Sequence, residues 1–488
     1  MKSSGREIEL KFSCGPEDLV TILAAAPAGD DETRELISVY FDTQDLALQK
    51  AGASLRVREH MGRRVQTVKR GRGLVREEHE APIEGLAPDP ALEPLPSLLP
   101  DGAMLKPAFN VRVSRRQRTF RYRAAEIELA LDQGEVTGGD QRSPICEVEL
   151  ELKSGPSAAL FALARDLAVA APIYLTFDSK AARGQALVAG ALPNTQPSKL
   201  ALPGEATIGE AFQAIAHQAL GQIAVNAAAL RLEPELEAVH QLRVGARRLR
   251  SALSTFEPLL EGDRLDRLAR EFRWLGQTCD AARNLDVFAD ETLGPAELAE
   301  NPHAGLSALR KAVDAARQTA WAKAREAVAC ERFRILMIDA AAWIETGDWK
   351  YGVDAKAPLK PFARHALDRH LKQLRKKGKK AWVGGDEARH HLRIQAKKLR
   401  YACDALASLY GEKATAKYLG RLKDLQQALG ALNDLATAEP LIASLALSPK
   451  AAFVAGELIG LKLAAKPQLM SRAAKALDHL EAADRFWG

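Results

Sequence analysis

The stretch "EIELKF", residues 7–12, decides the first half of the fold. Its three charged residues, Glu7, Glu9 and Lys11, alternate with three apolar ones, which is the period of a β-strand with one ionic and one apolar face. If the ionic face meets water, the paired carboxylates form an ordinary solvated edge. If that face is enclosed, they need partners of opposite charge, because unpaired charges are costly away from water.

Further segments with the same alternation follow up to about residue 185, separated by turn signals. Many short strands at regular spacing predict an antiparallel β-barrel. If helices and loops cover the outside, the ionic residues face the interior. In the run "VSRRQRTFRYR", Arg115, Arg121 and Arg123 compete for the inward positions that we assign to Arg116 and Arg118. The other predicted inward residues are Arg56, Arg58, Lys69, Arg76, Glu78, Glu80, Glu126, Glu128, Glu147, Glu149 and Glu151.

An enclosed surface that carries both carboxylates and guanidinium or ammonium groups suits two kinds of ligand. Carboxylate oxygens hold Mg²⁺ or Mn²⁺, and Arg and Lys neutralise phosphate oxygens. The paired glutamates are therefore interpreted as metal ligands. The sequence contains no G-x-x-x-x-G-K-[ST] loop, so a P-loop mechanism is not indicated.

Residues 5–190 resemble the CYTH domain family, the triphosphate tunnel metalloenzymes, through the ExExK signature of Glu7, Glu9 and Lys11. Further similar segments are "VYFDT" at 39–43, "LDQGEV" at 131–136 and "SKAARG" at 179–184. The resemblance implies an eight-stranded antiparallel tunnel that hydrolyses triphosphate with Mg²⁺ or Mn²⁺. It implies metal ligation by Glu7, Glu9, Glu149 and Glu151, and places Lys180 with Arg183 in the closing segment. The implied catalytic set is Glu7, Glu9, Lys11, Arg56, Arg58, Lys69, Glu78, Glu80, Arg116, Arg118, Glu128 and Lys180.

Composition and length fit a multidomain globular protein. At 488 residues the chain predicts two or three domains, and its five cysteines lack metal-site spacing. The N-terminus has no apolar signal region and no apolar stretch is long enough to span a membrane, so a cytoplasmic location and no membrane partner are expected. Association with polyphosphate granules is a further expectation. The net charge of +6 originates after residue 200, which is compatible with an anionic partner.

We expect an α+β protein of two domains: a sheet domain at 1–195, a linker at 196–206 rich in Pro and polar residues, and an all-α domain at 207–488. The all-α part contains an internal repeat. "HQLRVGARRLRSAL" from His240 matches "HHLRIQAKKLRYAC" from His390, and "LGQTCDAARNLD" from Leu275 matches "LQQALGALNDLA" from Leu425 at the same offset. These matches predict duplicated helical bundles, at about 210–345 and 360–488.

Each repeated helix carries a basic face opposite an apolar one, which is either a solvated face or half of a shared anion-binding surface. Residues 205–485 resemble the CHAD domain family, the conserved-histidine α-helical module, through the two H-x-L-R-[VI]-x-x-[RK]-[RK]-L-R helices. The resemblance implies binding of inorganic polyphosphate. The candidate binding residues are His240, Arg243, Arg247, Arg250, His390, Arg393, Lys397, Arg400, Lys376 and Lys377.

Alternatives remain open for both domains. His390 and His391 lack a carboxylate or cysteine at metal-site spacing, which favours phosphate contact or capping over metal ligation. Nucleic acid is disfavoured as the partner, because aromatic residues are only 6% of the chain and do not interleave with the basic stripes. The main prediction is an inorganic triphosphatase that acts on tripolyphosphate. The alternatives are thiamine triphosphate hydrolysis, adenylate-cyclase-like use of ATP in the same tunnel, or a non-catalytic polyphosphate-binding scaffold.

Overall fold

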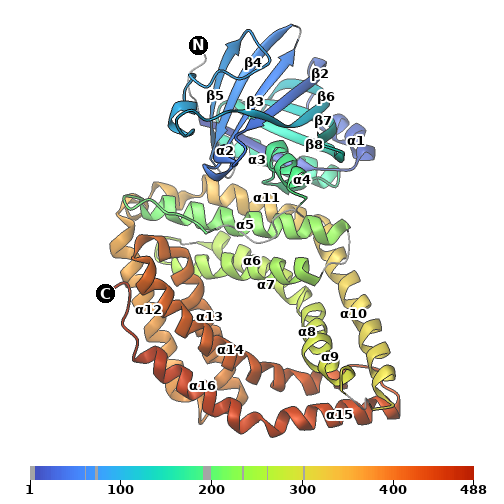
Figure 1. The fold of residues 1–488 in the computed structure, drawn as a ribbon, viewed down its shortest axis with the longest axis vertical. Coiled ribbons are helices and arrows are strands. Elements are labelled where there is room, and N and C mark those ends of the chain that lie inside the picture. The colour runs from blue at the N-terminus through green and yellow to red at the C-terminus, as the bar shows by residue number, and fades with distance from the viewer. Residues whose placement is uncertain are drawn as a thin grey trace. The chain divides into compact units, whose positions relative to one another are not determined.

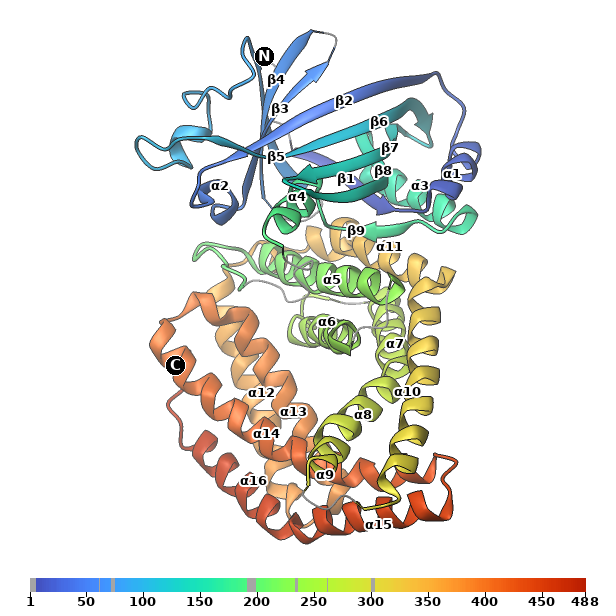
Figure 2. The ribbon, with the colours of Figure 1, turned by 45° about the vertical axis from the view of Figure 1, so that its right-hand side comes forward.

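The computed structural model describes residues 6–60, 62–71, 75–190, 199–232, 236–260, 262–299 and 303–488. For residues 6, 7, 60, 75, 76 and 236 it describes the backbone and not the side chain, so the side chains of Glu7 and Arg76 lie outside the described set, as does part of the predicted linker. The contacts divide the chain into two compact units. One unit contains the sheet and the other most of the helices (Figures 1 and 2).

The first unit contains an antiparallel sheet with the strand order β5-β4-β3-β2-β6-β7-β8-β1-β9. The strands are β1 (Arg6–Ser13), β2 (Asp31–Asp42), β3 (Ala53–His60), β4 (Arg63–Arg70), β5 (Val75–Ile83), β6 (Lys106–Tyr122), β7 (Ala125–Gly138), β8 (Gln141–Ser154) and β9 (Tyr174–Thr176). Four helices accompany them: α1 (Leu19–Ala25), α2 (Ala47–Lys50), α3 (Ser157–Ala170) and α4 (Lys180–Val188).

The prediction of an antiparallel sheet domain followed by a helical region is confirmed, but the eight-stranded barrel is inexact. A ninth strand, β9, pairs with β1 at Lys11–Ser13. The strands β5 and β1 meet over only three residue pairs, Arg6–Ile8 with Val75–Glu77, so the two ends of the sheet do not join along a full strand. The reason is that β1 shares one of its edges between β5, which pairs with Arg6–Ile8, and β9, which pairs with Lys11–Ser13.

The apolar face of the central strands is covered by a helix. Leu10, Phe12, Leu129 and Leu150 are fully or almost fully buried on the outer face of β1, β7 and β8. The helix α3 contacts β7 and β8 with an apolar stripe that includes Leu160, Leu163 and Leu167, all 0–1% exposed. Burial of about 25 cal/mol per Å² of apolar surface favours this arrangement. The alternating ionic residues consequently lie on the inner face of the sheet.

The helical part of the chain follows the predicted repeat closely. Its helices are α5 (Ile208–Leu232), α6 (Leu236–Thr255), α7 (Asp263–Thr278), α8 (Asp280–Phe288), α9 (Gly294–Glu297), α10 (Leu306–Ala329), α11 (Glu331–Thr346), α12 (Leu359–Ala381), α13 (Gly385–Leu406), α14 (Glu412–Ala443), α15 (Pro449–Ala464) and α16 (Lys466–Glu481). The helix α12 follows α5, and α13 follows α6, at nearly the same distance along the sequence. To within about two residues, that distance equals the one between the His240 and His390 motifs. The helices α12, α13, α14 and α16 lie side by side (Figures 1 and 2).

The first unit also contains two segments from the helical half of the sequence, Leu220–Ala229 of α5 and Val328–Gly347, which includes α11. Arg334 of α11 donates from Nε to the Ala168 carbonyl of α3 at 3.1 Å, and Asp339 accepts from Arg165. The Tyr174 hydroxyl donates to the Ala329 carbonyl at 2.9 Å. The helix α11 is thus part of the structure that supports α3.

Candidate functional site

The inner face of the sheet arranges its charges in rows, because antiparallel pairing brings residues directly opposite each other. In one row, Glu9 of β1 lies opposite Glu151 of β8, which lies opposite Glu128 of β7. In the next, Lys11 lies opposite Glu149. Like charges directly opposite each other are destabilising. The row of three glutamates therefore requires compensation by cations.

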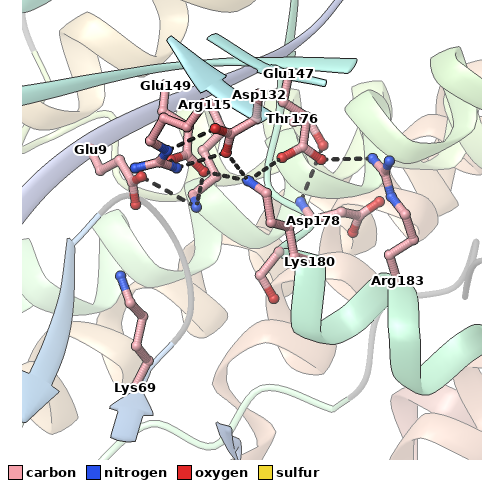
Figure 3. A network of polar contacts seen from close by, with 12 residues as sticks. Glu9, Lys69, Arg115, Asp132, Glu147, Glu149, Thr176, Asp178, Lys180 and Arg183 are labelled. Atoms are coloured by element: carbon pink, nitrogen blue, oxygen red, sulfur yellow. Dashed lines mark hydrogen bonds and ion pairs between the residues drawn. The ribbon is translucent and has the colours of Figure 1, made fainter. Parts of the chain in front are cut away.

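Beyond this row lies a buried ion-pair cluster around Lys180 (Figure 3). The Lys180 Nζ is 2.8 Å from Asp132 Oδ2, 2.8 Å from Glu147 Oε2 and 2.9 Å from Glu149 Oε1. All three carboxylates and the ammonium group are less than 10% exposed. Lys180 is the first residue of α4, and the Ser179 side chain caps that helix by accepting from the Ala182 N–H at 3.1 Å. The capped helix start therefore fixes where the ammonium group enters the cluster.

Glu149 is bound by three cations. The Lys11 Nζ lies 2.8 Å from Glu149 Oε1, and Arg115 donates both to Glu149 and to Asp132, the latter at 2.7 Å. Burial raises the pKa of Glu149, but the charges of Lys11, Lys180 and Arg115 outweigh burial and hold that pKa well below its usual range. Burial likewise disfavours charged Lys180, yet Glu149, Asp132 and Glu147 hold its pKa well above its usual value. The cations and carboxylates of the cluster therefore neutralise one another.

A second, more positive group lies on β3, β4 and β5. The Lys69 Nζ is 3.0 Å and the Arg56 Nη2 is 3.6 Å from Glu78, while Glu80 accepts from the Thr67 hydroxyl at 3.1 Å. Arg58 donates from Nε to the Ser38 hydroxyl at 3.1 Å. Burial, and then the charges of Arg56 and Arg115, lower the pKa of Arg58 to about 9. Arg56, Arg58 and Lys69 thus bring three cations to the inner face of the paired strands β3 and β4.

This group has unused capacity for an anion. The Arg56 Nε is buried and has no hydrogen-bond partner among the described residues. A buried N–H without an acceptor costs about 1–3 kcal/mol, which a bound oxyanion would recover. The inner face thus combines a carboxylate row at one place with guanidinium and ammonium groups at another.

The predicted metal ligands Glu7, Glu9, Glu149 and Glu151 stay a prediction. Glu9 and Glu149 share the cation Lys11, at 3.3 and 2.8 Å, and Glu151 pairs with Lys153 at 2.7 Å. In the described part of the chain, no group of three or more His, Cys, Asp or Glu residues is arranged to hold a metal ion. The donor chemistry nevertheless fits a hard divalent cation, since Glu9, Glu151 and Glu128 place three carboxylates in one row.

Two predicted inward residues lie elsewhere. Arg116 and Arg118 both bind Asp31, with their Nε atoms at 3.0 and 2.6 Å from its carboxylate. The inward residue of β6 is Arg115, directly opposite Asp132. The register of this strand is therefore one residue away from our prediction, and Arg116 and Arg118 stand on the opposite side. Arg121 is exposed, and Arg123 stands in a turn after β6 with φ 52°.

The structure adds the fully buried Asp132 to the residues that we predicted, and it brings the equally buried Glu147, predicted to face inward, into the ion-pair cluster. Asp132 could have been predicted from the alternation in β7, because it lies two strand periods after Glu128 and therefore on the same face. Glu147 was part of the alternating pattern but not of the implied catalytic set; its carboxylate binds Arg183 at 2.9 Å as well as Lys180.

In the helical part, the basic faces of α6 and α13 come together. Arg247 of α6 donates from Nη1 to the Tyr401 hydroxyl of α13 at 3.4 Å, and the Ser251 hydroxyl donates to the Lys398 carbonyl at 3.4 Å. Burial, followed by the charges of Arg247, Arg393 and Arg243, lowers the pKa of Lys397 to about 6. Arg243 and Arg247 of α6, with Arg393 and Lys397 of α13, stand where these two helices are in contact, and we call these four residues the cation cluster.

The cation cluster has limited compensation. Arg243 donates to Asp280, and Asp434 acts on Arg393 and Lys397 without a direct bond. The buried Arg393 Nε has no partner among the described residues.

The other candidate residues of this face differ in their surroundings. His390 contacts Asn433 Oδ1 through Nδ1 at 3.0 Å, and Arg400 donates to Gln426 at 2.9 Å. Burial, and then the charge of Arg283, lowers the pKa of His240. Arg250 is exposed on α6, whereas Lys376 and Lys377 belong to α12, where Lys376 is exposed and Lys377 half-buried. No helix of the described chain is both long and apolar enough to cross a membrane.

Comparison with known proteins gives two family matches. Residues 5–184 match the CYTH domain and residues 214–443 match the CHAD domain. An inorganic triphosphatase from Haemophilus influenzae is 31% identical over 201 residues, which is 37% of this chain and 55% of that protein, so the chain spans about half the length of this relative. The solved CHAD domain from the plant Ricinus communis is 31% identical with a TM-score of 0.53, and the similarity covers 60% of this chain and 97% of that one.

Proposed function

Because residues 5–184 form a CYTH domain and residues 214–443 form a CHAD domain, we propose that the first is a metal-dependent inorganic triphosphatase and the second binds inorganic polyphosphate. The enzymatic part of the proposal rests on the inner face of the sheet, which presents both carboxylates and cations. Its carboxylate row of Glu9, Glu151 and Glu128 lies on the same face of the sheet as Arg56, whose buried Nε has no hydrogen-bond partner among the described residues. The similarity to an inorganic triphosphatase supports the same reaction.

Tripolyphosphate would be held by Arg56, Arg58 and Lys69, which stand on the inner face of the neighbouring strands β3 and β4. Lys11 and Arg115 would complete the binding surface, held in place by Glu149 and Asp132. Glu7, Glu9, Glu149 and Glu151 are the proposed metal ligands, with Mg²⁺ or Mn²⁺ as the ion. A bound divalent ion neutralises developing negative charge and lowers the pKa of attached water. No side-chain nucleophile is required, because fixed cations orient the phosphates for attack by water.

The carboxylate row provides the test. Glu9→Gln should lower phosphate release from tripolyphosphate at least 100-fold while the protein stays folded, because it removes one charge from the row. Glu135→Gln is the matched control on the same sheet, since Glu135 lies on the outer face beside Arg142. Activity should also disappear with excess EDTA and return with Mg²⁺ or Mn²⁺. Full turnover by Glu9→Gln or in EDTA would contradict the proposed site.

Substrate comparison distinguishes the alternatives. Tripolyphosphate, ATP and thiamine triphosphate should be compared by kcat/KM, and tripolyphosphate should be preferred because the cations offer contacts for phosphate only. A preference for ATP or thiamine triphosphate would favour a nucleotide or thiamine reaction. Absence of turnover with every substrate would favour a non-catalytic scaffold.

The cation cluster carries the polyphosphate part of the proposal. Arg243, Arg247, Arg393 and Lys397 gather four cations from two helices, and a long phosphate chain supplies closely spaced anions. Affinity should fall steeply with salt, by analogy with the slope of about 0.7 per contact for single-stranded nucleic acid.

The measurement is titration of the full chain with long-chain polyphosphate and with single-stranded DNA. Replacing the four cluster residues by Ala should weaken polyphosphate binding at least tenfold. The control removes the same number of basic side chains through four lysines exposed on α14 and α15, Lys413, Lys417, Lys423 and Lys450. Equal loss in both variants, or DNA binding as tight as polyphosphate binding, would contradict the assignment.

A further inference from the structure

Two cysteines stand directly opposite each other where β1 ends beside β8. The pairing of Ser13 with Glu147 continues by one residue, so that the Cys14 N–H donates to the Cys146 carbonyl at 3.3 Å. Their Sγ atoms are 3.6 Å apart. Both residues are half-buried, whereas Cys279 and Cys403 are buried.

The backbone geometry suits a covalent link. Hydrogen-bonded residues opposite each other in antiparallel strands have Cα atoms about 5.5 Å apart, within the range of about 4.4–6.8 Å that disulfides span. The two sulfur atoms would have to approach from 3.6 Å to about 2.0 Å. Side-chain rotation supplies that change, because the strands are already paired and the backbone need not move.

We propose that Cys14 and Cys146 form a reversible dithiol–disulfide modification site that responds to peroxide-class oxidants and fastens the end of β1 to β8. The proposal is independent of the triphosphatase activity. It adds a redox-dependent restraint beside the ionic cluster, since Glu147 directly follows Cys146 and binds Lys180 and Arg183.

The chemistry requires one thiolate and one thiol. The hydrogen bond between the two sulfurs lowers the pKa of Cys146 and raises that of Cys14. The Cys146 thiolate attacks one peroxide oxygen and breaks the O–O bond, which gives a sulfenic acid and, after protonation, water. The Cys14 sulfur then attacks the sulfenic sulfur, forms the S–S bond, loses its proton and releases the second water. Two thiols lose two electrons and two protons, and the peroxide is reduced to two molecules of water.

A disulfide at this position should stabilise the sheet. It would join residues that are 132 positions apart, and closing so long a loop restricts the unfolded chain strongly. It would also hold the end of β1 that lies away from the short pairing with β5. We expect the thermal unfolding midpoint of the sheet domain to rise by about 5 °C or more on oxidation.

The test uses the full chain, treated with hydrogen peroxide and digested without reductant. Mass spectrometry should find the Cys14 peptide joined to the Cys146 peptide with a loss of two hydrogens, and dithiothreitol should reverse both the link and the rise in unfolding midpoint. Cys14→Ser and Cys146→Ser should each abolish the rise, whereas Cys330→Ser, as the matched control, should retain it.

The peptide measurement needs only the unsubstituted protein, so the test does not depend on the folding of a variant. The proposal is overturned if the folded protein is oxidised by peroxide elsewhere while the Cys14 and Cys146 peptides stay unlinked. It is also overturned if oxidised and reduced protein unfold at the same temperature, or if Cys14→Ser still shows the rise.

Discussion

At the scale of single residues, two lysines, one in each domain, have opposite surroundings. Lys180 is buried among Asp132, Glu147 and Glu149, which keep it charged. Lys397 is half-buried beside arginines, and burial, followed by their charges, lowers its pKa to about 6. Lys180 therefore neutralises the carboxylates around it, whereas Lys397 would regain its charge when an anion binds beside it.

Lys397 should make both stability and binding depend on pH. Its pKa is about 6 in the folded chain and about 10.4 in an unfolded one, so between these values the unfolded state binds more protons and stability rises with pH. Lys397→Met should flatten this slope and raise the free energy of unfolding at pH 7.5 by about 1 kcal/mol, because an apolar side chain loses less on burial than a charge.

Urea denaturation between pH 6 and pH 10 measures the effect, with Lys380→Met on the exposed face of α12 as the control. Polyphosphate should restore the charged form of Lys397 and take up a proton at pH 7.5. Calorimetry in two buffers of different ionisation enthalpy detects that uptake. A Lys397→Met protein that is no more stable than the parent, together with absence of proton uptake, would refute the assignment.

At the scale of elements, alternation in the sequence predicts which strands have an ionic face, and it fails where the contrast between the faces disappears. In β1 and β8 every second residue is apolar, so the inward set of Glu9, Lys11, Glu149 and Glu151 follows directly. In β6 cations occupy both phases of the alternation around Arg115 and Arg116, and the buried apolar residues Phe109, Val111 and Val113 share the phase of Arg115 instead of opposing it. Only the partner strand, through Asp132, decides which phase is buried.

The register of β6 can be tested with a matched pair of substitutions. Arg115→Met should destabilise the protein by about 3–5 kcal/mol, because it leaves Asp132 and Glu149 buried with one cation fewer. Arg116→Met removes an exposed ion pair with Asp31 and should cost less than about 1 kcal/mol. Chemical denaturation of both variants gives the difference. Equal costs, or a larger cost for Arg116→Met, would mean that the strand faces the other way.

At the scale of the whole molecule, sequence reasoning finds the sheet domain, the helical region and the internal repeat, but it does not identify the partner of α11. Its apolar residues, such as Phe333, Met337 and Ile344, mark it as a buried helix of the second half. Which surface buries a helix depends on contacts between distant residues, here between α11 and α3. The periodicity of one helix shows which of its faces is buried but not which surface covers that face.

A fragment comprising residues 1–195 should therefore be less stable than the same region in the full chain. Without α11, the helix α3 loses the contacts of Arg334 and Asp339. Hydrogen exchange at the amides of α3 should be at least tenfold faster in the fragment. The amides of β3 and β4 serve as the control, because the main contacts of α11 with the sheet domain are to α3 and β9. Unchanged protection of α3 would show that α11 contributes no support.

The placement of α11 with the sheet limits how such a chain can be recombined. A gene fusion that joined this sheet domain to another helical domain would have to bring a helix with a donor for the Ala168 carbonyl and an acceptor for Arg165. In this chain that helix is encoded more than 150 residues away from both. Exchange of modules at the boundary near residue 200 would separate the two partners. The halves of the chain are thus expected to be inherited together, and substitutions in α3 should be accompanied by changes in α11.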